Sequence, residues 1–169
     1  MASTDGLDLQ LLGIYMNDQL AAGVAWRELA RRSAASNAGS QAGAAVRGVA
    51  TQIAEDVETF EQTMRRLGIE PSRVKTSLAV AAERVGRLKL NGRLFSPSPL
   101  SRFVELDALA AGIEGKRILW ANLRDMAGLA ERLPDVDFDA LIERAERQRA
   151  TIEPFRAEAG REAFRGADG

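Results

Sequence analysis

The sequence predicts an all-α protein, a bundle of long helices with a shorter helix in the connection between its two halves. Apolar residues recur at i, i+3 and i+4 along most of the chain, the spacing of one helical face. No segment shows sustained polar–apolar alternation with β-branched residues. Ala, Leu, Arg and Glu, which lose little side-chain freedom in a helix, are abundant. We expect one domain over residues 1–169, with a core from about 7 to 165.

The first two helices are expected to form an antiparallel pair. The first runs from about Leu7 to Asn37 and ends at Gly39, because Asn and Gly tolerate the left-handed conformation. Ser40 caps the second helix, which runs to Leu67 and ends at Gly68. A link this short keeps the two helices adjacent. The buried stripes are Leu11, Tyr15, Asp18, Ala22, Ala25, Trp26 and Leu29 in the first helix, and Val46, Val49, Ala50, Ile53, Val57, Phe60, Met64 and Leu67 in the second.

A shorter third helix and a loop are expected to connect the two halves. Pro71 opens the third helix, and the Asn, Gly, Ser and Pro residues of 91–98 form a loop. The fourth helix begins near Pro99 and runs to about Leu129. The stripes are Val74, Leu78, Ala81, Ala82, Val85 and Leu88 in the third helix, and Phe103, Leu106, Leu109, Ala110, Ile113, Trp120, Leu123 and Ala127 in the fourth.

The fifth helix is expected to begin after a cap at Asp135 or Asp137. Pro154 inside it predicts either a kink or a boundary between two shorter helices. The residues expected to be buried are Phe138, Leu141, Ile142, Ala145, Ile152, Phe155 and Ala159.

Composition excludes several classes of site. The chain has no cysteine and no histidine. Disulfides, zinc–thiolate sites, iron–sulfur clusters and cysteine nucleophiles are therefore ruled out, and the commonest general base is missing. The 23 basic and 24 acidic residues give a net charge of −1, which excludes a strongly basic nucleic-acid binder. We expect no cofactor, and an enzyme is not favoured.

The chain carries no sign of export or of a membrane span. Its start, Met1 to Asp8, has two acids and no cationic region of the kind that opens a signal peptide. No stretch approaches the roughly 18 uninterrupted apolar residues that a membrane helix requires. The expectation is a cytoplasmic protein.

Charged residues on the apolar stripes predict a polar cluster inside the bundle. Asp18, Arg117 and Arg149 each fall between apolar residues at helical spacing. Burying an unpaired charge costs several kcal/mol, so these groups should meet each other or water. The cluster is interpreted either as a polar functional site or as an ion-pair layer that fixes helix register. Its expected members are Asp18, Arg117, Arg149, Tyr15, Glu114 and Glu146, with Asp56 and Glu61 at the flanks.

The order of helices, two antiparallel pairs joined by a long crossover, resembles the ferritin-like four-helix bundle. In the di-iron members of that superfamily, facing helices supply carboxylates and Glu-x-x-His motifs. The matching positions are Asp18, Glu55 with Glu58 or Glu58 with Glu61, Glu114, and Glu143 with Glu146. Both histidines are missing, and the guanidinium groups of Arg117 and Arg149 would repel a divalent ion. The resemblance therefore implies a bacterial member of the ferritin-like superfamily that lacks the di-iron site.

Positive charge is concentrated in the expected crossover. Residues 71–104 carry seven cations and one acid. This segment is interpreted as a surface for an anionic ligand or an acidic partner, or as a connection neutralised within the fold or a dimer. Nucleic acid is not favoured as a partner, because no binding motif is present. The basic patch consists of Arg84, Arg87, Lys89, Arg93 and Arg102.

These features support one leading hypothesis and two alternatives. The leading hypothesis is a non-enzymatic bundle that self-associates, as a dimer, and binds a partner or an anionic ligand through the basic crossover. One alternative is a carboxylate-rich metal-binding protein or metalloenzyme using Asp18, Glu58, Glu114 and Glu146. The other is a small-molecule carrier with an apolar cavity. Its lining would be Tyr15, Trp26, Phe60 and Trp120.

Overall fold

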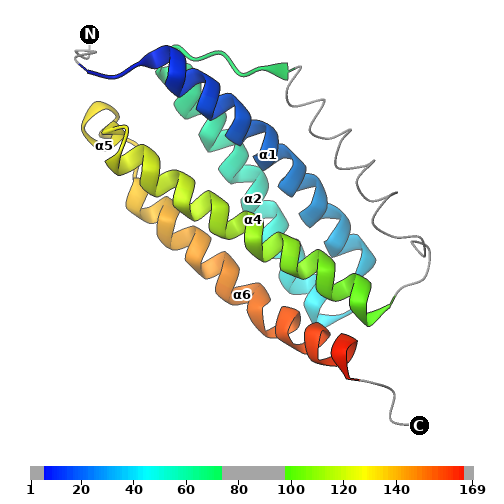
Figure 1. Cartoon of the computed structure of the whole chain (residues 1–169). Helices are drawn as coiled ribbons and strands as arrows, with labels where there is room; N and C mark the ends of the chain where they lie inside the picture. The colour runs from blue at the N-terminus through cyan, green and yellow to red at the C-terminus, as the bar shows by residue number, and fades with distance from the viewer. Residues whose placement is uncertain (1–5, 74–97, 166–169) are drawn as a thin grey trace.

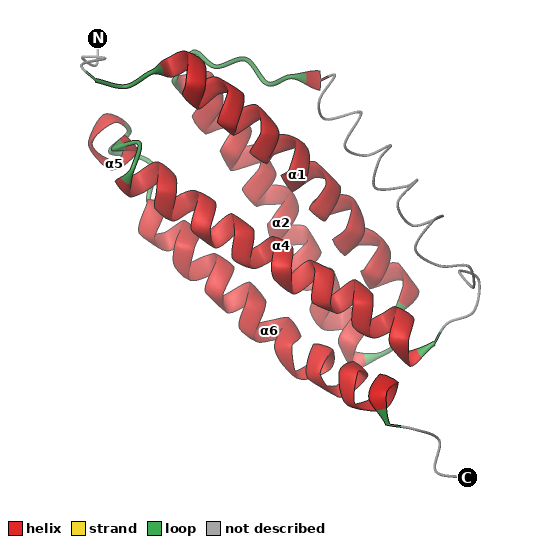
Figure 2. Ribbon diagram, in the orientation of Figure 1, coloured by secondary structure: helices red, strands yellow, loops and turns green. Residues whose placement is uncertain are grey.

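A computed structural model describes residues 6–73 and 98–165, and every regular element in these two ranges is a helix (Figure 2). The predicted all-α class is therefore confirmed. The expected third helix and the loop after it fall almost wholly outside the described residues. No helix in the described part is long and apolar enough to cross a membrane. The helices are α1 (Leu9–Ser36), α2 (Gln41–Arg66), α4 (Pro99–Asp125), α5 (Leu129–Arg132) and α6 (Phe138–Phe164).

The four long helices pack side by side as two antiparallel pairs (Figure 1). The most extensive contacts join α1 with α2 and α4 with α6. The pairs meet where α1 contacts α4 and where α2 contacts α6. Helix α2 ends at one end of the molecule and α4 begins at the other (Figure 1).

Polar caps fix the helix ends where the sequence predicts them. The Ser40 hydroxyl accepts a hydrogen bond from the Gly43 amide at 3.0 Å at the start of α2. Gly68, at a φ of +74°, follows the end of α2 in the left-handed conformation. Of the two aspartates expected at the last helix, Asp137 is the cap, and its carboxylate accepts from the Ala140 amide at 2.9 Å.

Two predicted boundaries are wrong. The fourth helix stops at Asp125 instead of Leu129, and Gly128, with a φ of +60°, separates it from the short α5. A left-handed glycine ends a helix because other residues adopt that conformation at a cost. Pro154 lies inside the single helix α6, so the boundary offered as one of two alternatives there is wrong, whereas the kink stays a prediction. Ile152 and Ala159 are buried on either side of Pro154, so packing outweighs its local cost.

The core consists of two apolar clusters. One joins the first half of α1 to the second halves of α2 and α4, and includes Phe60, Trp120 and Phe138. The other joins the remaining halves and includes Leu106 and Ile152. The predicted stripes of α2, α4 and α6 supply most of the second cluster and about half of the first, and their members are buried or packed against the core, so these three faces were predicted correctly.

The predicted buried face of α1 is rotated from the observed one. Leu11 has 63% of its surface exposed, whereas Leu12, Met16 and Leu20 are buried. Asp18, expected near the middle of the buried face, is exposed. Helix α1 begins with apolar residues on all sides, so the helical spacing selects no single face.

Candidate functional site

A buried polar layer lies across α2, α4 and α6. It consists of Asp56, Lys116 and Gln148, and we call it the central polar layer. The Lys116 ammonium donates hydrogen bonds to Oδ2 of Asp56 and to Oε1 of Gln148. Gln148 Nε2 donates to the same Asp56 oxygen at 3.0 Å. The exposed fractions of the Asp56 and Lys116 side chains are 3% and 16%, so the ion pair is largely removed from water.

A second cation balances the layer. Arg144 on α6 places its Nε 3.2 Å from the other Asp56 oxygen, Oδ1, and also pairs with Glu55. Two acids thus face two bases, and the group is neutral. Burial lowers the pKa of the Lys116 ammonium below its usual value, and the adjacent Asp56 carboxylate opposes that shift.

The central polar layer is suited to fixing the register of α2, α4 and α6 relative to one another. On α2, Asp56 stands between Ile53 of one apolar cluster and Val57 of the other. Removing one member of a buried pair leaves the other charge uncompensated, at a cost of about 3–5 kcal/mol. In the observed register of α2, α4 and α6, the three side chains hydrogen-bond to one another. The layer therefore matches the ion-pair interpretation of the predicted cluster, with Asp56, expected at its flank, at the centre and with Lys116 and Gln148 in place of Arg117 and Arg149.

Four members of the predicted cluster do meet, but at the surface. Glu114, Arg117, Glu146 and Arg149 line a shallow pocket of about 340 Å³ between α4 and α6. Glu146 and Arg149 are exposed. Arg117 donates to Glu114 at 2.7 Å and holds the pKa of that carboxyl below its usual range. Their predicted burial is wrong, because long charged side chains at the edge of a stripe extend into water.

The other two members of the predicted cluster lie elsewhere. Asp18 is exposed on the outer side of α1. Tyr15 is half-buried, and its hydroxyl accepts a hydrogen bond from Asn122 Nδ2 at 3.3 Å. The tyrosine therefore joins α1 to α4.

The metal-site alternative expected four carboxylates to converge. Asp18, Glu58 and Glu146 are exposed on three different helices, and Glu114 is paired with Arg117. Within residues 6–73 and 98–165, no three acidic side chains are grouped so that they could hold a metal ion. The expected convergence is therefore wrong, and these residues do not fit a di-iron centre.

The aromatic residues proposed to line a cavity pack into other side chains. Phe60 and Trp120 meet edge to face with ring centroids 5.5 Å apart. The Trp26 ring lies over Gly112 so closely that a Cβ built there would be 2.5 Å from the indole. Trp120 is 1% exposed.

The predicted basic patch falls mostly in residues 74–97. Arg84, Arg87, Lys89 and Arg93 lie outside the described residues. Arg102 is exposed at the start of α4, where its guanidinium is 3.7 Å from the Glu162 carboxylate.

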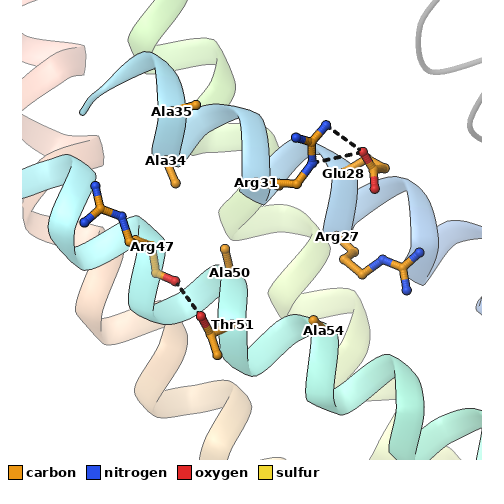
Figure 3. Close-up of a pocket in the computed structure, with 9 residues that line it drawn as sticks. All are labelled: Arg27, Glu28, Arg31, Ala34, Ala35, Arg47, Ala50, Thr51 and Ala54. Atoms are coloured by element: carbon orange, nitrogen blue, oxygen red, sulfur yellow. Dashed lines mark hydrogen bonds and ion pairs between the residues drawn. The ribbon is translucent and has the colours of Figure 1, made fainter.

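A groove between α1 and α2 carries positive charge that the sequence analysis did not single out (Figure 3). Its volume is about 520 Å³. Its charged residues are Arg27, Glu28 and Arg31 from α1 and Arg47 from α2. We call it the arginine groove. The rest of the lining consists of Ala34, Ala35, Ala50, Thr51 and Ala54.

Two of the three arginines are unpaired. Arg31 bonds to Glu28 at 3.2 Å, but Arg27 and Arg47 form no ion pair with any described residue. The groove therefore carries a surplus of two positive charges over methyl groups. The sequence does place part of this groove, because Arg47, Ala50 and Ala54 of α2 share one helical face. Only the pairing of α1 with α2 adds Arg27 and Arg31 to that face.

The neutral buried layer and the open cationic groove differ in their capacity to bind a ligand. The buried layer has all its charges matched, whereas the groove offers unmatched donors to solvent. Comparisons of the chain with protein-family models, with curated proteins and with solved structures gave no match, so the function is argued from this geometry.

Proposed function

We propose that this protein acts by binding an anionic ligand with an apolar body in the arginine groove. The observation that carries the proposal is the pair of unmatched guanidinium groups, Arg27 and Arg47, beside a floor of alanines. Arginine donates several hydrogen bonds in a fixed plane and suits carboxylate or phosphate groups. The binding role agrees with the anionic-ligand hypothesis from the sequence, but uses a surface other than the crossover.

The size and lining of the groove support a small ligand. A volume of about 520 Å³ falls within the range of ligand sites, about 300–1,000 Å³. The alanine methyls leave room along the helix backbones and present apolar surface to the ligand. Apolar contact with a few polar anchors is the usual composition of such sites.

We further propose that the chain is a ferritin-like bundle that lacks the di-iron site. Two antiparallel pairs, α1 with α2 and α4 with α6, support this assignment, as does the start of α4 at the opposite end of the molecule from the end of α2. The central polar layer supports it too, because the Lys116 ammonium is a protein cation held among oxygens inside the bundle.

The groove is tested by titrating decanoate, a carboxylate with a plain apolar tail, into the purified full chain and measuring the heat of binding. Decanoate is expected to bind, and Arg27→Gln with Arg47→Gln together to weaken binding at least tenfold, because charged hydrogen bonds contribute about 1.5–3 kcal/mol. The matched control is Arg161→Gln, which removes an exposed arginine near the end of α6. Equal affinity in the double variant and the control would contradict the proposal.

A second candidate function is self-association, and the outer face of α4 favours it. Val104 and Ile118 are 54% and 46% exposed, and Ala111 between them is also exposed. Val104 and Ile118 each lie seven residues from Ala111. An isologous dimer needs a self-complementary surface. With a twofold axis at Ala111, antiparallel copies of α4 would place Val104 of one chain against Ile118 of the other.

Ala111→Glu is expected to abolish this dimer, because it places two carboxylates together on the axis. Sedimentation velocity at micromolar concentration would report the change from dimer to monomer. Ala150→Glu, at an exposed alanine of α6, is the control and should leave the dimer intact. A dimer that survives Ala111→Glu would exclude this face.

A further inference from the structure

The two unmatched arginines stand at opposite ends of the arginine groove. Arg47 of α2 lies across from Ala34 of α1, and Arg27 lies across from Ala54 (Figure 3). Arg27 and Ala34 are seven residues apart on α1, which corresponds to two turns and about 10 Å along the axis. The two guanidinium groups point toward the two ends of the groove and away from each other (Figure 3).

The middle of the groove is neutral. There Arg31, which faces Ala50 of α2, reaches back along α1 to pair with Glu28, the residue that follows Arg27. A small compact anion at the centre would meet an arginine that is already paired, and would reach neither end. The electrostatic pattern along the groove is therefore positive, neutral and positive.

From this pattern we infer that the ligand is a linear dianion, with an anionic group at each end and an apolar chain between them. This inference rests on the proposed function and adds the shape and charge of the ligand. One terminal carboxylate would pair with Arg27 and the other with Arg47. The methylene chain between them would cover Ala50 and Ala54, which face the groove from α2.

The geometry disfavours two other kinds of anion. Inorganic phosphate carries its charge within a single small group, so it can contact one end only. A fatty acid has the apolar chain but a single carboxylate, and would leave one arginine unmatched. A dianion of matching length satisfies both arginines.

The test is a calorimetric titration of the full chain with hexanedioate, octanedioate, decanedioate and dodecanedioate. Decanoate is the matched monoanion, and inorganic phosphate is the compact one. Affinity is expected to rise with length up to the ten- or twelve-carbon diacid, which spans the two-turn separation when extended. The ten-carbon diacid should bind at least tenfold tighter than decanoate, because a second charged hydrogen bond forms.

Variants locate the second contact. Arg47→Gln should lower decanedioate affinity to about that of decanoate, and Arg27→Gln should do the same, while Arg161→Gln should leave both affinities unchanged. Ala50→Leu, which fills the floor, should weaken every ligand in the series. The helical circular dichroism of each variant shows whether it is folded.

The outcomes separate the inference from the function on which it rests. Equal affinity for decanedioate and decanoate, both reduced by the arginine substitutions, overturns the dianion but leaves anion binding in the groove. Tighter binding of phosphate than of any diacid also overturns the inference. Absence of binding by the whole series overturns both. A length optimum that is lost in either arginine variant supports the inference.

Discussion

Replacing Asp56 by alanine is expected to lower the free energy of unfolding by about 3–5 kcal/mol, because it leaves the buried Lys116 ammonium without its carboxylate. The Asp56 side chain is 3% exposed, and it accepts from both Lys116 and Gln148. Arg144 would lose a contact as well. Urea denaturation followed by circular dichroism measures the loss.

The matched control for this experiment lies two residues along the same helix. Glu58 is exposed, so Glu58→Ala should change the free energy of unfolding by no more than about 0.5 kcal/mol. Replacing all three polar side chains of the layer, Asp56→Leu with Lys116→Met and Gln148→Met, should recover most of the stability, because apolar groups of similar volume then replace the buried polar groups and leave none without a partner. A loss below about 1 kcal/mol in Asp56→Ala would show that the layer does not hold the helices.

The second large effect is expected at Gly43, in the first turn of α2. A Cβ at this position would lie 2.0 Å from the carbonyl oxygen of Asn37, which is backbone and has little freedom to move. Gly43→Ala should therefore destabilise the protein by about 1–3 kcal/mol, despite the higher helix propensity of alanine. Thermal unfolding of the variant would give the size of the loss.

The same substitution at Gly48 should have the opposite effect on the free energy of unfolding. A Cβ there meets nothing within 4 Å, so Gly48→Ala should gain about 0.5–1 kcal/mol from helix propensity alone. Both glycines lie in α2, and the chemical change is identical. If both substitutions stabilised the protein, the link between α1 and α2 would have to differ from the one described.

The sequence predicts the buried faces of α2 and α4 correctly because each carries one dense apolar stripe. Val46, Val49, Ile53, Val57 and Phe60 follow helical spacing, and all are buried. The opposite side of α2 is polar, so only one orientation buries the apolar groups. Helix α1 lacks that contrast. Leu11 and Leu12 are equally apolar, and the packing of α2 and α4 decides which of the two enters the core.

Two of the three polar residues of the interior, Lys116 and Gln148, were missed by one position. Lys116 follows Ile113 by three and precedes Trp120 by four, whereas Arg117 follows by four and precedes by three. The two positions are equivalent with respect to the stripe, and the same holds for Gln148 and Arg149 between Ala145 and Ile152. Helix spacing does not distinguish the two positions. Which of them enters the interior depends on whether a partner such as Asp56 lies opposite it in the bundle.

The arginine groove was not predicted from the sequence, for a different reason. Its charge comes from Arg27 and Arg47 on separate helices, neither of which belongs to a basic run. The concentration of positive charge in residues 71–104 predicts an anion-binding surface on the crossover instead. Local charge density identifies patches within one segment, whereas a groove requires the register between two helices.

The position of the central polar layer also bears on the order in which the chain folds. Contacts within the α1–α2 and α4–α6 pairs close short loops, whereas Asp56 meets Lys116 across 60 positions and Gln148 across 92. Short loops close at lower entropic cost, so each pair can assemble before the two associate. The Lys116 ammonium then loses its water only when the pairs dock. Interactions that form this late act chiefly on the unfolding rate, so the layer would set how long the folded state persists.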